Sequence, residues 1–257
     1  MKGYIARLKS GCSIPVFVLW WVLRIAMLAA FVLNFSADSF SLTGQIHIGF
    51  CFISSFFWEL SLAMPKKSIF RLIPASIHTV FNVGLTVSAV LGVYFNLYYG
   101  LKAFDPILQA FFGFVSVLYG YEIAYAMVKR DHFAATKAMV FFAAFGVSFI
   151  LFNVWELGEF FTDQVIGHIT GQPGNAQFWS VLLAEGTARE GGVIPALVDE
   201  RAALMDIMLD IIVHFSSAFL ALIYINVFPY RLRGKYKYDI EYGNNIVELN
   251  ETVNSRK

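Results

Sequence analysis

The segment DIMLDIIVH at residues 206–214 sets Asp206, Asp210 and His214 four residues apart in an otherwise apolar sequence. Residues four apart lie on one face of an α-helix, so these side chains would form a single polar stripe. Carboxylate and imidazole groups bind divalent cations and transfer protons. At a rise of about 1.5 Å per residue the stripe is about 12 Å long, so one ion cannot contact all three side chains. We therefore expect either two ions or a division into ligands and acid–base groups.

A second acidic stripe occurs in WELGEFFTD at residues 155–163, where Glu156, Glu159 and Asp163 share a helical face. An acid near the centre of a membrane costs about 2.5–3.5 kcal/mol, so several acids need protonation, a cationic partner or a metal ion. We expect the two stripes to face each other at the same depth. The predicted ligands for Zn, Mn, Fe or Mg are Glu156, Glu159, Asp206, Asp210 and His214. Glu159 and His214 are also the predicted acid–base groups.

Four other ionisable residues lie within apolar sequence: Arg24 lies in the middle of the first run, and the other three fall toward the opposite side of the membrane. Glu59, His78 and Glu122 are predicted to form an inner polar cluster there. Arg24 is the predicted buried counter-charge, but one arginine cannot neutralise all of these acids. A metal ion or shared protons therefore remain the expected compensation at the outer stripes.

Other polar and aromatic side chains have simpler expected roles. His47 lies at the end of an apolar run and is predicted to be solvated. Tyr98 and Trp155 are predicted to anchor helices at the membrane surface, where aromatic side chains are enriched.

The elements that must position these residues are six apolar runs, each long enough to cross a hydrocarbon core of about 30 Å. The sequence is 58% hydrophobic and only 14% charged, which is typical of a polytopic membrane protein rather than a soluble domain. We therefore predict an all-α membrane domain over residues 1–233, with six helices in one bundle. The runs lie at residues 14–35, 46–64, 74–98, 105–128, 133–161 and 202–228.

Basic residues gather at both termini, in the second and fourth connections and at the start of the fifth run. The other three connections hold only Lys102, Arg189 and Arg201. Positive charge favours the cytoplasmic side, so both termini are predicted to be cytoplasmic. Residues 162–201 would then form an outer loop over the mouth of the last two helices, and residues 234–257 a polar cytoplasmic tail. The net charge of +1 argues against a nucleic-acid partner.

Three segments together resemble the YjdF-like family of bacterial integral inner-membrane proteins. They are FDPILQAFFGF at 104–114, WELGEFFTD at 155–163 and DIMLD at 206–210, in the order the family has them. The resemblance implies a bacterial inner-membrane location but no assigned reaction. It adds Asp105, Gln109, Asp163 and Gln172 as residues that support the acidic site, with Gln109 standing where the family has a histidine.

The preferred interpretation is a membrane protein that binds a divalent metal at its outer acidic site and acts on a lipid or lipid-linked substrate by hydrolysis or group transfer. A proton- or cation-coupled transporter or channel is an alternative, in which a homo-oligomer would supply further helices. A non-catalytic assembly or immunity protein, with polar residues that bind a partner helix, is a third.

Overall fold

The computed structural model describes residues 12–36, 41–65, 68, 70, 73–101, 103–131, 135–170, 200–228 and 246–247. This part of the chain is mostly helical, as predicted, and one short antiparallel pair of strands is the exception. The helices are α2 (Ile14–Asn34), α3 (Leu42–Ser54), α4 (Phe57–Ala63), α5 (Ala75–Thr86), the π-helical η2 (Val87–Tyr94), α6 (Leu97–Gly100), α7 (Phe104–Asp131), α8 (Lys137–Thr170) and α9 (Glu200–Val227); the strands are β1 (Ala135–Thr136) and β2 (Ile246–Val247).

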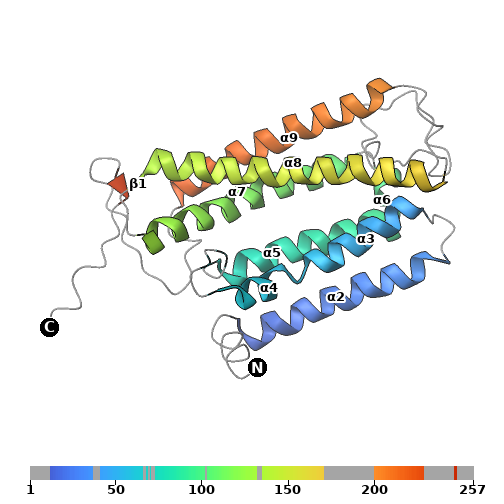
Figure 1. Ribbon diagram of the computed structural model, residues 1–257, viewed down its shortest axis with the longest axis horizontal. Coiled ribbons are helices and arrows are strands. Elements are labelled where there is room, and N and C mark those ends of the chain that lie inside the picture. Colours follow the sequence, from blue (N-terminus) through green and yellow to red (C-terminus); the bar gives the residue numbers. More distant parts are fainter. Residues whose placement is uncertain are drawn as a thin grey trace.

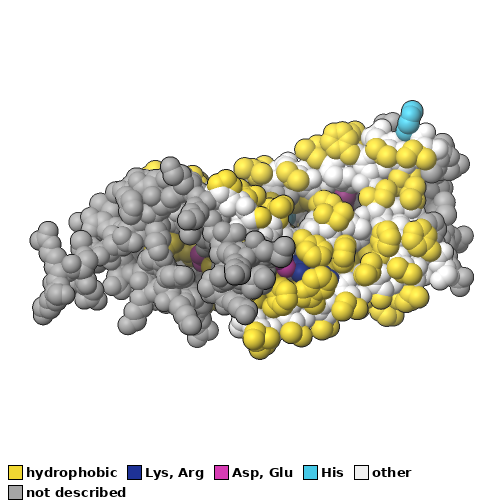
Figure 2. Space-filling view, turned by 60° about the horizontal axis from the view of Figure 1, so that its bottom comes forward, with side chains coloured by type: hydrophobic (Ala, Val, Ile, Leu, Met, Phe, Trp, Pro, Cys, Tyr) yellow, Lys and Arg dark blue, Asp and Glu magenta, His cyan; other side chains and the backbone are white. Residues whose placement is uncertain are grey.

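Five helical segments among the described residues are long and apolar enough to cross a membrane: α2, α5 with η2, α7, α8 and α9. The consecutive helices α3 and α4 meet at a bend of 41° and make a sixth span if they are counted as one. Figure 2 shows hydrophobic side chains over much of the described surface on one face. Large apolar side chains such as Phe142 and Ile150 are mostly exposed. These features indicate a multi-pass membrane protein.

The long helices run along a common axis, with α2 at one edge of the bundle and α9 at the other (Figure 1). Helix α7 is central: 72% of the residues in its apolar stretch are buried, whereas the corresponding share is 22% for α2 and for α8. It packs most extensively against α8 and α9. Helix α8 continues to Thr170, so residues 162–170 are helical rather than part of the predicted outer loop. In the polar tail, β2 pairs with β1 beside the start of α8.

Two glycines allow α7 to approach its neighbours closely. A Cβ atom placed on Gly113 would lie 2.7 Å from the His214 carbonyl oxygen and would collide with Ser217 Oγ on α9. A Cβ on Gly120 would lie 2.9 Å from Val147 Cβ on α8. Small residues at helix contacts let backbones come together in membranes, where close packing drives association. Gly113 therefore brings the first half of α7 against the acidic stripe of α9.

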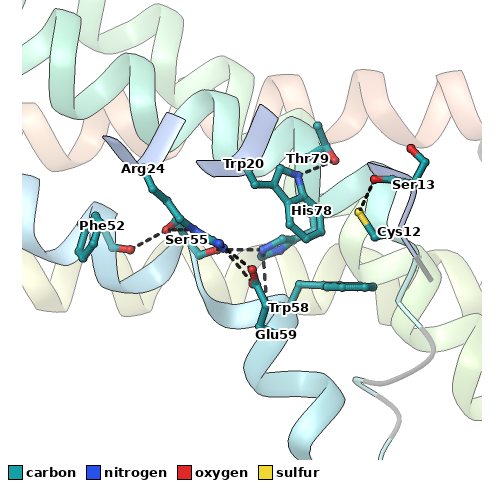
Figure 3. A network of polar contacts seen from close by, with 10 residues as sticks. All are labelled: Cys12, Ser13, Trp20, Arg24, Phe52, Ser55, Trp58, Glu59, His78 and Thr79. Atoms are coloured by element: carbon teal, nitrogen blue, oxygen red, sulfur yellow. Dashed lines mark hydrogen bonds and ion pairs between the residues drawn. The ribbon is translucent and has the colours of Figure 1, made fainter. Parts of the chain in front are cut away.

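The bend between α3 and α4 is filled by Arg24 from α2. Its guanidinium donates to the Ser55 carbonyl over 2.6 Å and to Ser55 Oγ over 3.1 Å. It also forms an ion pair with Glu59, in which its two terminal nitrogens lie 2.6 and 2.9 Å from the two carboxylate oxygens (Figure 3). The Phe56 ring lies 3.9 Å from the guanidinium carbon. Arg24 thus forms hydrogen bonds with the backbone at the bend and neutralises Glu59, an acid of the bent span.

The third span ends earlier than its predicted boundary at residue 98. The π-helical segment ends at Tyr94, and Asn96 takes a left-handed conformation with φ 60°. The chain then forms the short helix α6, which carries Tyr98 into the bundle interior. A Cβ on Gly92 would collide with the Tyr98 ring, so the glycine leaves space for this ring.

Changing Gly113 to Ala should destabilise the bundle, because the added methyl group overpacks the contact with α9 at a cost of about 1–3 kcal/mol. Gly146→Ala on α8 is the matched control, since a Cβ there meets nothing within 4 Å. Thermal unfolding in detergent should show a lower midpoint for Gly113→Ala and an unchanged or higher one for Gly146→Ala. Equal midpoints would contradict the close approach.

Replacing Arg24 by Met should destabilise the protein by about 3–5 kcal/mol, because Glu59, whose side chain is 11% exposed, would lose its cationic partner. The double variant Arg24→Met with Glu59→Gln should recover part of this loss, since it removes both charges. Denaturant unfolding of the four proteins of this cycle measures the coupling. Additive effects of the two substitutions would show that the ion pair contributes nothing.

Candidate functional site

Three aspartates from two helices form the centre of the acidic site. Asp105 lies in the first turn of α7, and Asp206 and Asp210 lie one turn apart on α9. All three are buried, and each offers a carboxylate oxygen within 4.8 Å of the others. Gln109, one turn after Asp105, donates from Nε2 to Asp210 Oδ2 over 3.3 Å. Asp105 and Gln109, predicted as supporting residues, therefore lie within the cluster itself.

The stripe on α8 lies close to these aspartates. Glu159 is close enough to Asp105, Asp206 and Asp210 to interact with them electrostatically. Glu156 interacts in the same way with Asp105 and Asp210. Glu156 is buried and Glu159 partly so. The structure thus brings the predicted stripes of α8 and α9 together and adds Asp105 from α7. Five carboxyl groups from three helices share one end of the bundle, here named the acidic end.

His214, the third member of the α9 stripe, lies outside the group of three aspartates. Its Nε2 is 3.0 Å from Ser148 Oγ on α8, and its ring packs 4.6 Å from that of Phe152. Ser148 in turn bonds Ser116 of α7 over 2.6 Å. A role for His214 as a metal ligand or an acid–base group stays a prediction. Of the other predicted residues, Asp163 is buried one turn beyond Glu159, and Gln172 lies outside the described residues.

Two members of the predicted inner cluster, Glu59 and His78, lie at the bend in the second span. His78 Nε2 lies 3.3 Å from both the Ser55 carbonyl oxygen and the Trp58 backbone nitrogen (Figure 3). His78 and Glu59 therefore belong to the network of Arg24. Glu122, the third predicted member, is buried on α7.

A largely apolar cavity of about 250 Å³ lies between the helices. His78 and Phe57 line one part of it, whereas Asp105, Gln109 and Glu159 line another. The remaining lining residues are Phe50, Ser54, Phe81, Leu85, Ser88, Tyr98, Leu108, Phe112, Ser116, Tyr119, Leu151, Phe152, Val154, Trp155 and His214. The cavity thus joins the acidic end to the region of the arginine network.

Sequence reasoning missed a second polar group, in which His47 lies behind two residues of the cavity wall, Ser88 and Tyr98. His47 is buried, and its Nε2 lies 2.6 Å from Ser88 Oγ, which lies 2.7 Å from the Tyr98 hydroxyl. The predictions that His47 is solvated and that Tyr98 anchors the membrane surface are therefore wrong. Trp155 packs its ring 5.2 Å from that of His47 and lines the cavity. The available signal was that His47, although near the end of its apolar run, stands between Ile46 and Ile48.

The aspartate cluster has the chemistry of a site for a hard divalent cation. Its donors are all carboxylate oxygens, which suit Mg²⁺, Mn²⁺ or Ca²⁺ better than the nitrogen and sulfur ligands that Zn²⁺ prefers. Asp210 Oδ1 and Glu156 Oε1 are buried and accept no hydrogen bond from any described residue. A buried carboxylate oxygen without a donor is costly, so both atoms suit a bound cation. Asp105, Asp206 and Asp210 could hold one ion.

Comparisons with known proteins add no relative from which a role could be transferred. The chain matches no protein-family model, no curated protein and no solved structure.

Proposed function

We propose that this protein is a bacterial-type inner-membrane protein that binds a divalent cation at its acidic end and hydrolyses or transfers a group of a lipid or lipid-linked substrate. The observation that carries the proposal is a largely apolar cavity whose lining includes the carboxyl groups of Asp105 and Glu159. Ligand sites are mostly apolar with a few convergent polar groups, and an amphiphile has the same division between tail and headgroup. The positive-inside rule supports an outward-facing acidic end.

Access from the bilayer is supported by side chains that line the cavity and also reach the surface. Phe50 on α3 is 50% exposed, and Val154 on α8 is 58% exposed. Leu151, one turn before Trp155, is likewise exposed. Because the outer surface of the bundle faces lipid, an opening between α3 and α8 would admit an acyl or isoprenoid chain sideways. The headgroup would then lie toward Asp105 and Glu159.

Each group at the acidic end has a role in this proposal. Asp105, Asp206 and Asp210 hold the cation, and Gln109 fixes the Asp210 carboxylate through its hydrogen bond. A bound Mg²⁺ or Mn²⁺ supplies a Lewis acid at the polar end of the cavity. Glu159 lines the cavity and is placed to accept or return a proton. The surrounding apolar side chains exclude bulk water.

A cation or proton pathway is the second candidate. It is favoured by one observation: His78, beside the arginine network, lines the same cavity as Asp105 and Glu159. Intramembrane ionisable residues that share a cavity mark ion pathways as well as active sites. Flux through proteoliposomes that is lost in His78→Ala would support this candidate, and no flux under imposed proton or Mn²⁺ gradients would exclude it.

The purified protein should bind about one Mn²⁺ per chain, and Asp210→Asn should weaken binding at least about tenfold, because it removes a negatively charged ligand. Glu122→Gln is the matched control: this buried acid lies about 25 Å from Asp105 along α7. Electron paramagnetic resonance titration measures free Mn²⁺ in both variants. Equal affinities, or no binding by the parent protein, would overturn the metal site.

A bulkier side chain inside the cavity should displace an amphiphile. Leu108 lines the cavity and is 6% exposed, whereas the adjacent Ile107 points outward and is 60% exposed. Leu108→Phe should weaken binding of a fluorescent long-chain alkyl phosphate by about tenfold, or about 1.4 kcal/mol. Ile107→Phe should leave binding unchanged. Equal affinities of two variants with parent-like melting temperatures would show that the probe binds elsewhere.

A further inference from the structure

The geometry of Ser88 and His47 fits a nucleophile with its general base. Ser88 Oγ lies 2.6 Å from His47 Nε2, within the roughly 2.6–3.2 Å over which a base can take the serine proton. Ser88 is 1% exposed overall, yet it lines the cavity. Its hydroxyl is therefore screened from bulk water and open to whatever occupies the cavity.

Three separate elements hold this pair in place. Ser88 belongs to η2. π-Helical segments are rare in proteins, and those that occur are often found at functional sites. His47 belongs to α3, where its ring is packed edge-on against Tyr98 at 5.9 Å and Trp155 at 5.2 Å. The left-handed turn at Asn96 brings Tyr98 back so that its hydroxyl lies 2.7 Å from Ser88 Oγ. When Ser88 donates to His47, its oxygen can accept from Tyr98.

A second histidine–serine pair in the same bundle serves as an internal comparison. His214 Nε2 lies 3.0 Å from Ser148 Oγ, so hydrogen bonding alone does not distinguish the two pairs. Such bonds also join helices in membranes without any reaction. The pairs differ in which member lines the cavity: in the first pair it is the serine, Ser88, whereas in the second it is the histidine, His214, and not Ser148. A role in chemistry is thus assigned to Ser88 by the cavity rather than by the hydrogen bond.

We propose that Ser88 and His47 form a nucleophile and general base that act on a carboxylic ester of the amphiphile in the cavity. The inference rests on the proposed function for this occupant and deepens it by naming an acyl ester as the substrate class. Tyr98 is a positioning residue that orients the serine oxygen. The pair needs no metal ion for its own step.

The reaction balances without a redox partner. Ser88 Oγ attacks the ester carbonyl carbon while its proton passes to His47 Nε2. The bond between the carbonyl carbon and the alcohol oxygen breaks, and the alcohol leaves with the proton from His47. Water, deprotonated by His47, then attacks the carbonyl carbon of the acyl-Ser88 ester. The bond from this carbon to Ser88 Oγ breaks, a carboxylic acid leaves, and the proton on His47 passes to Ser88 Oγ and restores the hydroxyl.

The test uses a hexadecyl fluorophosphonate, which forms a bond from serine oxygen to phosphorus and releases fluoride. Incubation with the full-length protein in nanodiscs should add one probe per chain by intact mass, and peptide mapping should place it on Ser88. Ser148→Ala should label at the parent rate, whereas Ser88→Ala should not label. The absence of a Ser88 adduct on the parent protein, or an adduct on Ser148 instead, would overturn the proposal.

The base is tested separately. His47→Ala should slow labelling at least about 100-fold, the usual contribution of a general base. Added imidazole should restore the rate, because it supplies a base to the vacated space, and a purely structural defect would not be rescued this way. Equal labelling in His47→Ala, or a loss that imidazole leaves unchanged, would overturn the role of His47. Labelling that persists in EDTA while Mn²⁺ binding is absent would separate this inference from the metal site.

Discussion

The close approach of α7 to α9 at Gly113 decides where the polar groups of this bundle meet. A side chain larger than hydrogen at this position would run into the backbone of His214. With the two helices in contact there, Asp105 at the start of α7 reaches the level of Asp206 and Asp210 on α9. The cluster of aspartates is therefore a consequence of the packing of two helices, α7 and α9. Sites carried on rigid helices hold their geometry better than sites on loops.

The buried charges are compensated differently at the bend of the second span and at the acidic end. At the bend of the second span, Arg24 pairs with Glu59 and also bonds the Ser55 carbonyl, so one cation satisfies both an acid and the bent backbone. At the acidic end, five carboxyl groups from three helices lie close together, and two of their buried oxygens accept no hydrogen bond from a described residue. Arg24 is already bonded at the bend. The arrangement at the acidic end therefore favours an added cation or bound protons.

The sequence predicts local features of this protein well and long-range ones poorly. Hydrophobic runs locate the spanning helices, and the spacing of three and four residues correctly puts the acids of α8 and α9 on common faces. The bend at Ser55, however, follows from a tertiary contact with Arg24, and no proline or glycine marks it. Asp105 stands at a helix start, where an acid is usually solvated, and joins the cluster only because Gly113 permits the contact. Periodicity gives the faces of a helix and leaves open which face meets which neighbour.

His47 and the cavity illustrate the same limit and connect the chemistry to the fold. The π-helical turn and the left-handed Asn96 bring Ser88, Tyr98 and His47 together from three elements, and none of these backbone features has a periodic signature in the sequence. The cavity is a property of the assembled helices alone. Because its wall carries exposed side chains between α3 and α8 and buried carboxyl groups at one end, it is suited to an occupant with a long apolar part and one polar group. Such an occupant would pass Ser88 along the same wall that leads to Asp105. A cavity whose lining met only water at its two ends would instead favour an ion path, so the exposure of Phe50 and Val154 on its wall is the feature that favours a lipid occupant over transport.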